Sequence, residues 1–252
     1  MPRLVGSEMC IRDSINIVAS GELGPGMGIF RSKPIMSVGK GYDKKKDLSG
    51  APDAALKQSQ QIRLWMTSYV CYQDNKFKEN LAKEVKTFIL KWAQSKAFMK
   101  TRKNNSDNYC CIQDAVLTMN YDMSDFITAY LIVTKDFPDK KKNKEVIVKW
   151  FKNYMKKYGN RHFKKDGVGQ FFNQHAVIRD YLNIKIAVLT NNNELFSKSA
   201  KRALIVLAQS TPEGVYPFTA TRGQKAMWYS MEMMNDYTHL LEVLRAQGYD
   251  LF

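Results

Sequence analysis

Apolar residues recur every three or four positions through most of the chain after about residue 52, which is the spacing of an amphipathic helix. Polar and proline-containing stretches interrupt this pattern and indicate turns. Alternating, strand-like patterns are scarce, so we predict an all-α protein. The predicted helices cover residues 52–72, 76–99, 109–136, 144–158, 171–190, 194–209 and 221–247.

Particular residues mark where these helices end. Phe137-Pro138 ends the third helix, because the residue before a proline avoids helical backbone, and residues 140–142 (all lysine) follow in the turn. Residues 191–193, three asparagines, predict the turn of a helical hairpin. Residues 211–217 form a second predicted turn, and Gly248 closes the last helix. Repeated antiparallel helix pairs predict an α/α toroid, that is, an incomplete helical barrel.

The first 50 residues lack this pattern. Residues 1–14 resemble translated sequencing-adapter sequence, so we exclude them from the fold and expect the true N-terminus and any signal peptide to be missing. Residues 15–50 are rich in Gly, Pro, Ser and Lys and predict an irregular segment. Their Gly-x-Gly-x-Gly run lacks the strand–turn–helix context of a nucleotide site. We therefore predict an irregular segment over 1–50 and one helical domain over 51–252.

The chain carries a net charge of +15. Such a charge attracts polyanions, namely nucleic acid, anionic lipid or acidic polysaccharide, although a solvated lysine-rich surface is the alternative explanation. We do not expect nucleic acid, because no helix-turn-helix, RNA-recognition or zinc motif is present. We do not expect a membrane partner either, because no apolar run is long enough to span a bilayer.

The four cysteines do not have the spacing of a zinc site. Cys71 is a candidate for a disulfide with Cys110 or Cys111 if the protein is exported, and buried free thiols are the other interpretation. We expect no metal and no other cofactor.

Two stretches carry candidate chemistry. In the first, Arg222 and Tyr229 are seven residues apart, which predicts that they lie two turns apart on one face of a helix. Gly223 indicates that this helix starts here, and the backbone N–H groups at a helix start favour anions. The second stretch is Asn173-Gln174-His175, at the start of another apolar helix.

Together these stretches resemble the alginate lyase family, the poly-mannuronate lyases. The shared features are the amide–His cluster, a helical hairpin after it, an Arg-Gly-x-x-Ala-x-x-Tyr helix and a closing Gly-x-Asp-Leu-aromatic at residues 248–252. The resemblance is clearest over residues 143–252. It implies an α/α-toroid lyase domain acting on a polyuronate, most of all mannuronate-rich alginate. It also implies an acidic polysaccharide as partner, a monomer, and a periplasmic or secreted location.

The resemblance assigns roles that suit β-elimination. A lyase acting on a uronate must remove the C5 proton beside a carboxylate, so it has to neutralise that carboxylate and place a base at the carbon. Gln174, His175 and Arg222 are the implied neutralisers, and the guanidinium can bind a carboxylate bidentately. Tyr229 is the implied base, which also returns a proton to the leaving oxygen. The predicted substrate contacts are Asn173, Lys225 and Trp228.

Each candidate also has a structural interpretation. His175 follows two phenylalanines and suits a core histidine, Tyr229 beside Trp228 suits simple packing, and Arg222 suits a surface turn. Gln174 stands where the family's usual motif has asparagine, and its extra methylene is predicted to shift the carboxylate clamp. The alternative function is a non-catalytic basic helical protein that binds an acidic polysaccharide or another polyanion.

Overall fold

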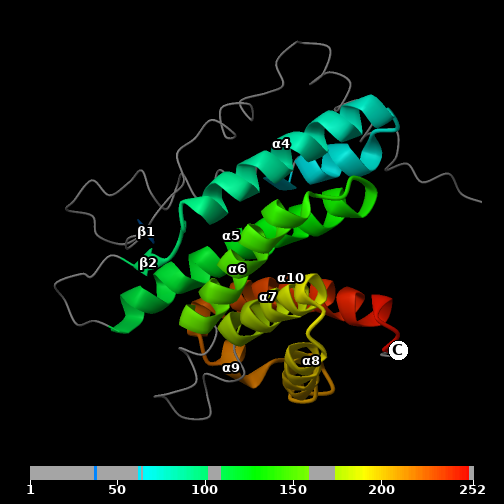
Figure 1. Cartoon of the computed structure of the whole chain (residues 1–252). Coiled ribbons are helices and arrows are strands. Elements are labelled where there is room, and N and C mark those ends of the chain that lie inside the picture. The colour runs from blue at the N-terminus through cyan, green and yellow to red at the C-terminus, as the bar shows by residue number, and fades with distance from the viewer. Residues whose placement is uncertain (1–36, 39–61, 64, 102–108, 159–173, 250–252) are drawn as a thin grey trace, which may run out of the picture. The chain divides into compact units, whose positions relative to one another are not determined.

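The computed structural model describes residues 37–38, 62–63, 65–101, 109–158 and 174–249 (Figure 1). These residues fall into two compact units, one ending at Trp150 and the other running from Phe151 to Phe252. The single helical domain expected over 51–252 stays a prediction. Asn173, residues 1–14 and most of the 15–50 segment lie outside the described residues.

The described residues form helices joined by turns, with one pair of two-residue strands. A helix ends at Cys71 and is followed by α4 (Asn75–Gln94), α5 (Tyr109–Asp136) and α6 (Lys141–Tyr158). The strands β1 (Ser37–Val38) and β2 (Lys100–Thr101) pair in parallel, with Ser37 opposite Lys100. The second unit contains α7 (Gln174–Thr190), α8 (Asn193–Leu207), α9 (Pro217–Ala220), the 3-10 helix η3 (Gly223–Lys225) and α10 (Ala226–Ala246). None of the helices described here combines the length and low polarity that crossing a membrane requires.

The helix α4 ends five residues earlier than its sequence pattern predicts. Lys96 and Phe98 have φ angles of 53° and 59°, in the left-handed region that an α-helix does not contain. The Phe98 side chain is fully buried, and its ring lies 5.2 Å from that of Trp92. Burial of this ring offsets the backbone strain, so tertiary packing rather than local propensity sets the end of α4.

The helix α6 begins three residues earlier than predicted. The carboxylate of Asp139 accepts hydrogen bonds from the backbone N–H of Lys140 (2.8 Å) and from the side-chain amide of Asn143 (3.3 Å). The carboxylate thus bonds one backbone donor just before the helix and one side-chain donor in its first turn, which favours a helix start at this point. Lys141 and Lys142, predicted to lie in the turn, therefore belong to the first turn of α6.

Aromatic rings form the core of the first unit. The Phe126 ring of α5 makes T-shaped contacts with the rings of Phe88 and Trp92 of α4, at centroid distances of 5.5 and 5.0 Å. Such T-shaped contacts add to the stabilisation that burial itself gives. The indole N–H of Trp150 donates to the carbonyl oxygen of Ala97 at 2.9 Å, so this buried donor is satisfied.

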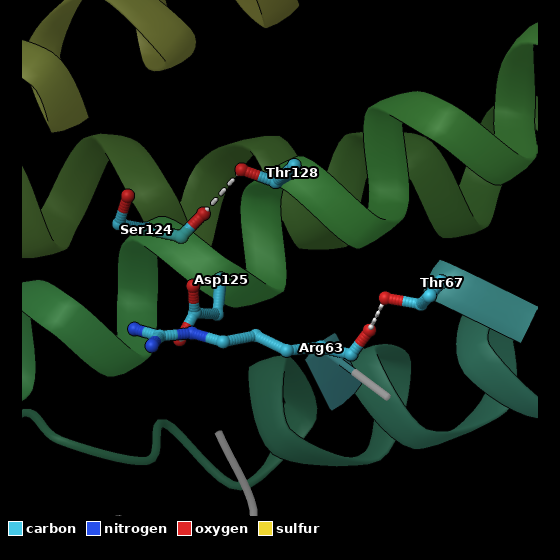
Figure 2. Close-up of polar contacts among 5 residues, drawn as sticks. All are labelled: Arg63, Thr67, Ser124, Asp125 and Thr128. Carbon is cyan, nitrogen blue, oxygen red and sulfur yellow. Dashed lines mark hydrogen bonds and ion pairs between the residues drawn. The ribbon is translucent and has the colours of Figure 1, made fainter. Parts of the chain in front are cut away.

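The helix that ends at Cys71 is joined to α5 by polar contacts. Arg63 Nε donates to the carboxylate of Asp125 at 2.8 Å, and the Arg63 side chain is 58% exposed (Figure 2). Figure 2 also shows the hydroxyls of Thr67 and Thr128 donating to the carbonyl oxygens one turn earlier on their own helices. An ion pair that is this exposed contributes about 1 kcal/mol at most.

In the second unit, α7 and α10 lie side by side and run parallel (Figure 1). Near the start of α7, Val177 packs with Met233 and Tyr237 of α10. Two turns later, Ile184 packs with Leu240. Because the contacts advance together along both helices, α7 and α10 begin at the same end of the unit.

The helix α8 completes this core as the antiparallel partner of α7. Asn191 has a φ of 52°, and Asn192 caps α8 by accepting a hydrogen bond from Leu195 N–H at 3.0 Å. This confirms the predicted asparagine turn of the hairpin. The hydroxyl of Tyr237 on α10 donates to the carbonyl oxygen of Ala203 on α8 at 2.5 Å, so α10 is bonded to α8 as well as packed against α7.

Candidate active site

A short segment between α9 and α10 carries the first candidate stretch. The hydroxyl of Thr219 is buried, donates to the Tyr216 carbonyl oxygen at 2.9 Å and lies 2.7 Å from the hydroxyl of Ser230 on α10. The backbone N–H of Arg222 donates to the Thr219 carbonyl oxygen at 3.1 Å. These bonds hold the end of α9 against the start of α10 and fix the path of the chain between them.

The predicted helix over 221–247 is wrong at its start. Gly223 has a φ of 59°, so it lies in the left-handed region and cannot begin an α-helix. Instead it opens the 3-10 turn η3, and α10 begins only at Ala226. Arg222 therefore precedes α10, and the expected geometry of two residues on one helical face is also wrong. At the other end, α10 stops at Ala246 and Gly248 has a φ of 87°, which confirms the predicted glycine closure.

The structure nevertheless brings Arg222 and Tyr229 together. The guanidinium carbon of Arg222 lies 4.6 Å from the centroid of the Tyr229 ring, which is a cation–π contact. Arg222 is exposed and Tyr229 is half-buried. A fixed positive charge thus lies over a phenol that remains accessible from solvent.

Two of the three predicted substrate contacts lie in the segment between Arg222 and Tyr229. The Trp228 ring lies 4.9 Å from the Tyr229 ring at an interplanar angle of 63°, and Trp228 is 60% exposed. Lys225, at the end of η3, is exposed as well. The surface around Tyr229 therefore offers cations for a carboxylate and a flat aromatic ring for the apolar side of a sugar.

The second candidate stretch begins α7. Gln174 and His175 are the first two residues of that helix, while their side chains and the whole of Asn173 lie outside what the structure describes. Gln174 is about one turn before Val177, and Tyr229 is about one turn before Met233. Since Val177 and Met233 belong to one core cluster, both stretches lie at the same end of the parallel pair α7 and α10.

A buried charge cluster on α7 went unnoticed in the sequence. Asp180 accepts a hydrogen bond from Arg202 Nε of α8 at 3.0 Å and pairs with Arg179 Nε at 3.6 Å. The side chains of Asp180 and Arg179 are 1% and 2% exposed. Burial raises the pKa of the Asp180 carboxyl, whereas Arg179 and Arg202 lower it, and burial lowers the pKa of Arg179 to about 10.

The position of this cluster bears on the candidate site. Arg179 is four residues after His175, so it lies one turn along the same face of α7. The available signal in the sequence was a charged Arg-Asp pair inside the otherwise apolar run 176–182. Such a pair on a core helix indicates partners on a neighbouring element.

Gly223→Ala is expected to reduce the activity of the candidate site more than the stability of the fold. An added Cβ would meet nothing within 4 Å, so the only penalty is the left-handed backbone, about 1–2 kcal/mol. A shift that relieves the strain would move Arg222 off the Tyr229 ring. The matched control is Gly214→Ala, at φ 79° and equally uncrowded, in the turn before α9. Urea unfolding should show similar losses for both variants, and assays of the activity that the resemblance implies should show a loss only for Gly223→Ala. Equal activities would contradict this role of Gly223.

Solved structures share the fold of this chain. Alginate lyase A1-III from Sphingomonas species A1 superposes with a TM-score of 0.66 at 16% identity, covering 95% of this chain and 70% of that chain. A histidine-to-alanine variant of alginate lyase A1-III complexed with tetrasaccharide gives 0.67 at 16%, covering 88% and 60%. A tyrosine-to-phenylalanine variant with tetrasaccharide gives 0.67 at 15%, covering 96% and 70%. These similarities establish the fold, and they confirm the predicted all-α, toroid-type class.

Comparison of the amino-acid sequence with known proteins and protein families also identifies alginate lyases. No curated protein matches the chain significantly. The alginate lyase family model, by contrast, matches residues 33–252, which is most of the chain and includes both candidate stretches. The chain therefore belongs to the alginate lyase family of polysaccharide lyases.

Proposed function

We propose that the chain cleaves a mannuronate-rich polyuronate, alginate above all, by β-elimination at the surface around Tyr229. The observation that carries this proposal is the contact between the Arg222 guanidinium and the Tyr229 ring, at 4.6 Å. It places a permanent cation beside a group that can exchange a proton. The start of α7, with Gln174 and His175, belongs to the same end of the unit.

In the proposed reaction the Tyr229 oxygen takes the C5 proton of the uronate at the cleavage point. The electrons of the C5–H bond form a C4–C5 double bond, and the C4–O bond to the neighbouring sugar breaks. The leaving oxygen then receives a proton from the same tyrosine, so the step is balanced without an oxidant or a cofactor. A single residue acting first as base and then as acid gives typically 10²–10⁴-fold of rate acceleration.

The other candidates act on the carboxylate. Negative charge builds up there as the C5 proton leaves, so groups that stabilise the charged carboxylate lower the barrier. Arg222 supplies a fixed charge, and Gln174 and His175 supply a hydrogen-bonding amide and an imidazole. In place of the usual asparagine, Gln174 adds a methylene, which we propose alters the preference among uronates. Trp228, Lys225 and Asn173 are the proposed contacts to neighbouring sugars.

Two further observations support a polysaccharide substrate. Variants of alginate lyase A1-III with the same fold are complexed with tetrasaccharide. The net charge of +15 suits a polyanionic substrate. In line with such a substrate, we propose that the protein acts as a monomer in the periplasm or after secretion, and without nucleic acid or a membrane as partner.

The test is ultraviolet absorbance over time with poly-mannuronate, poly-guluronate and a glucuronan in parallel. Elimination creates an unsaturated uronate that absorbs, so we expect a rise that is fastest with poly-mannuronate. A rise with another polymer alone would reassign the substrate. No rise with any polymer, from protein with a helical circular dichroism spectrum, would contradict the lyase reaction. Salt-sensitive binding of the same polymers would then favour the non-catalytic polyanion-binding alternative, which the charge of +15 also suits.

A further inference from the structure

One face of α6 carries a row of lysines. Lys141, Lys142, Lys149, Lys152 and Lys156 are all exposed, and at 100° per residue they project within about one third of the helix circumference. We call this set the α6 lysine stripe. From its first to its last residue it extends about 22 Å along the helix.

The opposite face of α6 anchors the stripe. Trp150, Phe151 and Tyr154 are at most 3% exposed, and the Trp150 indole N–H is bonded to the Ala97 carbonyl oxygen at 2.9 Å. A helix held this way cannot rotate about its axis without exposing its aromatic side. The Cα–Cβ bonds of the five lysines therefore point to one fixed side of the helix.

The helix α6 carries an excess of positive charge that its own residues do not balance. Its 18 residues contain a single acidic side chain, Glu145, which lies on the same face as the stripe, three or four residues from Lys141, Lys142 and Lys149. One carboxylate offsets only part of the charge of five lysines, and none of the ion pairs found among the described residues involves the stripe. Lysines at i, i+3 or i, i+4, such as Lys149 with Lys152, repel each other by about 0.2–0.5 kcal/mol per pair. Lys141 and Lys142 lie in the first turn, where the helix dipole disfavours cations, whereas Lys156 lies in the last turn, where the dipole favours them.

By comparison, α4 intersperses its lysines with Glu79 and Glu84, as expected for a solvated helix. Stability therefore explains the charge pattern of α4 but not that of α6. A partner with a row of negative charges would convert the repulsion along α6 into binding free energy.

We infer that the α6 lysine stripe is an accessory binding surface for the acidic polysaccharide, distinct from the residues around Tyr229. This inference rests on the proposed function for the identity of the polymer. A polyuronate carries one carboxylate per sugar, and flexible lysines can follow such a chain without fixed geometry. The stripe would keep the protein bound to a long substrate between cleavage events. It would add no affinity for an oligosaccharide too short to reach it.

The chemistry of α6 favours this polymer over two other polyanions. Binding of single-stranded nucleic acid relies on exposed aromatic rings that stack with bases, and the aromatic side chains of α6 are buried. Binding in a membrane interface needs a free apolar face on the helix, and that face of α6 packs in the core.

The test compares two triple variants of the full chain. In the stripe variant, Lys142, Lys149 and Lys156 are replaced by Gln. In the control, Lys76, Lys83 and Lys198 are replaced by Gln, which are exposed lysines on α4 and α8 that change the net charge equally. The readout is affinity electrophoresis through gels containing poly-mannuronate. Exposed charge contacts contribute about 0.2–1 kcal/mol each, so we expect roughly tenfold weaker binding for the stripe variant and less than threefold for the control.

Further measurements separate the possible outcomes. The difference between the variants should vanish in about 1 M salt, where the screening length falls to about 3 Å. Turnover of a tetramannuronate should be the same for both. Equal weakening in the two variants would overturn the inference, because overall charge would then explain binding. The inference would also be overturned if the stripe variant lost binding to duplex DNA or to anionic phosphatidylserine vesicles but retained its affinity for poly-mannuronate. Electrophoresis requires no turnover, so a flat absorbance trace would reject the lyase reaction without rejecting the stripe.

Discussion

Tyr229→Phe is expected to lower kcat on poly-mannuronate by about 10²–10⁴-fold, the typical contribution of a positioned acid–base group. The substitution removes only the phenolic oxygen that would accept the C5 proton. Because the ring remains, it keeps its contacts with Arg222 and with Trp228. Stability and polymer binding should therefore stay close to those of the parent. The measurement is the rate of absorbance increase, together with the affinity of the variant for poly-mannuronate.

The matched control for this variant is Tyr249→Phe. Tyr249 is also accessible, at 37% exposure, and its ring lies 5.9 Å from that of Phe196. It follows the end of α10, whereas Tyr229 lies near the start of that helix. The control should keep full activity. If Tyr229→Phe also cleaved the polymer at the parental rate, the phenol would not be the base, and Tyr229 would serve only to pack against Arg222.

The sequence predicts the helices well because a helix with one buried face has apolar residues at a regular spacing in its own sequence. The segment 109–136 coincides with α5, and the asparagine turn marks the α7–α8 hairpin. The ends of α4 and α6 depend on contacts that are not local. Phe98 ends α4 by entering an aromatic core that includes residues of α5, and no pattern within α4 records that core.

The candidate site shows the same division between local and tertiary information. The spacing of Arg222 and Tyr229 led us to expect that they lie close together, and they do, although Gly223 and η3 replace the helix assumed between them. A glycine can mark either a helix start or a left-handed turn, and only the structure distinguishes the two. The Asp180–Arg202 pair joins residues 22 positions apart on different helices, so no spacing rule could have identified it.

Asp180→Asn is expected to reduce the free energy of unfolding by about 3–5 kcal/mol, the usual result of removing one partner from a buried ion pair. Asparagine keeps the shape of the side chain but leaves the buried charge of Arg179 without its carboxylate. Total stabilities of natural domains are about 5–15 kcal/mol, so much of the margin would be lost. The measurement is urea unfolding of the full chain, followed by circular dichroism.

Two further variants identify the cause of this loss of stability. Arg63→Gln breaks the exposed pair with Asp125, where the arginine is 58% exposed, and should change stability by about 1 kcal/mol at most. Arg179→Met combined with Asp180→Asn removes the buried guanidinium together with the carboxylate that it faces and should recover part of the lost stability. A loss below about 1 kcal/mol for Asp180→Asn alone would contradict the assignment of a stabilising buried ion pair. Since Arg179 lies one turn from His175, the charge of this cluster contributes to the field at the start of α7.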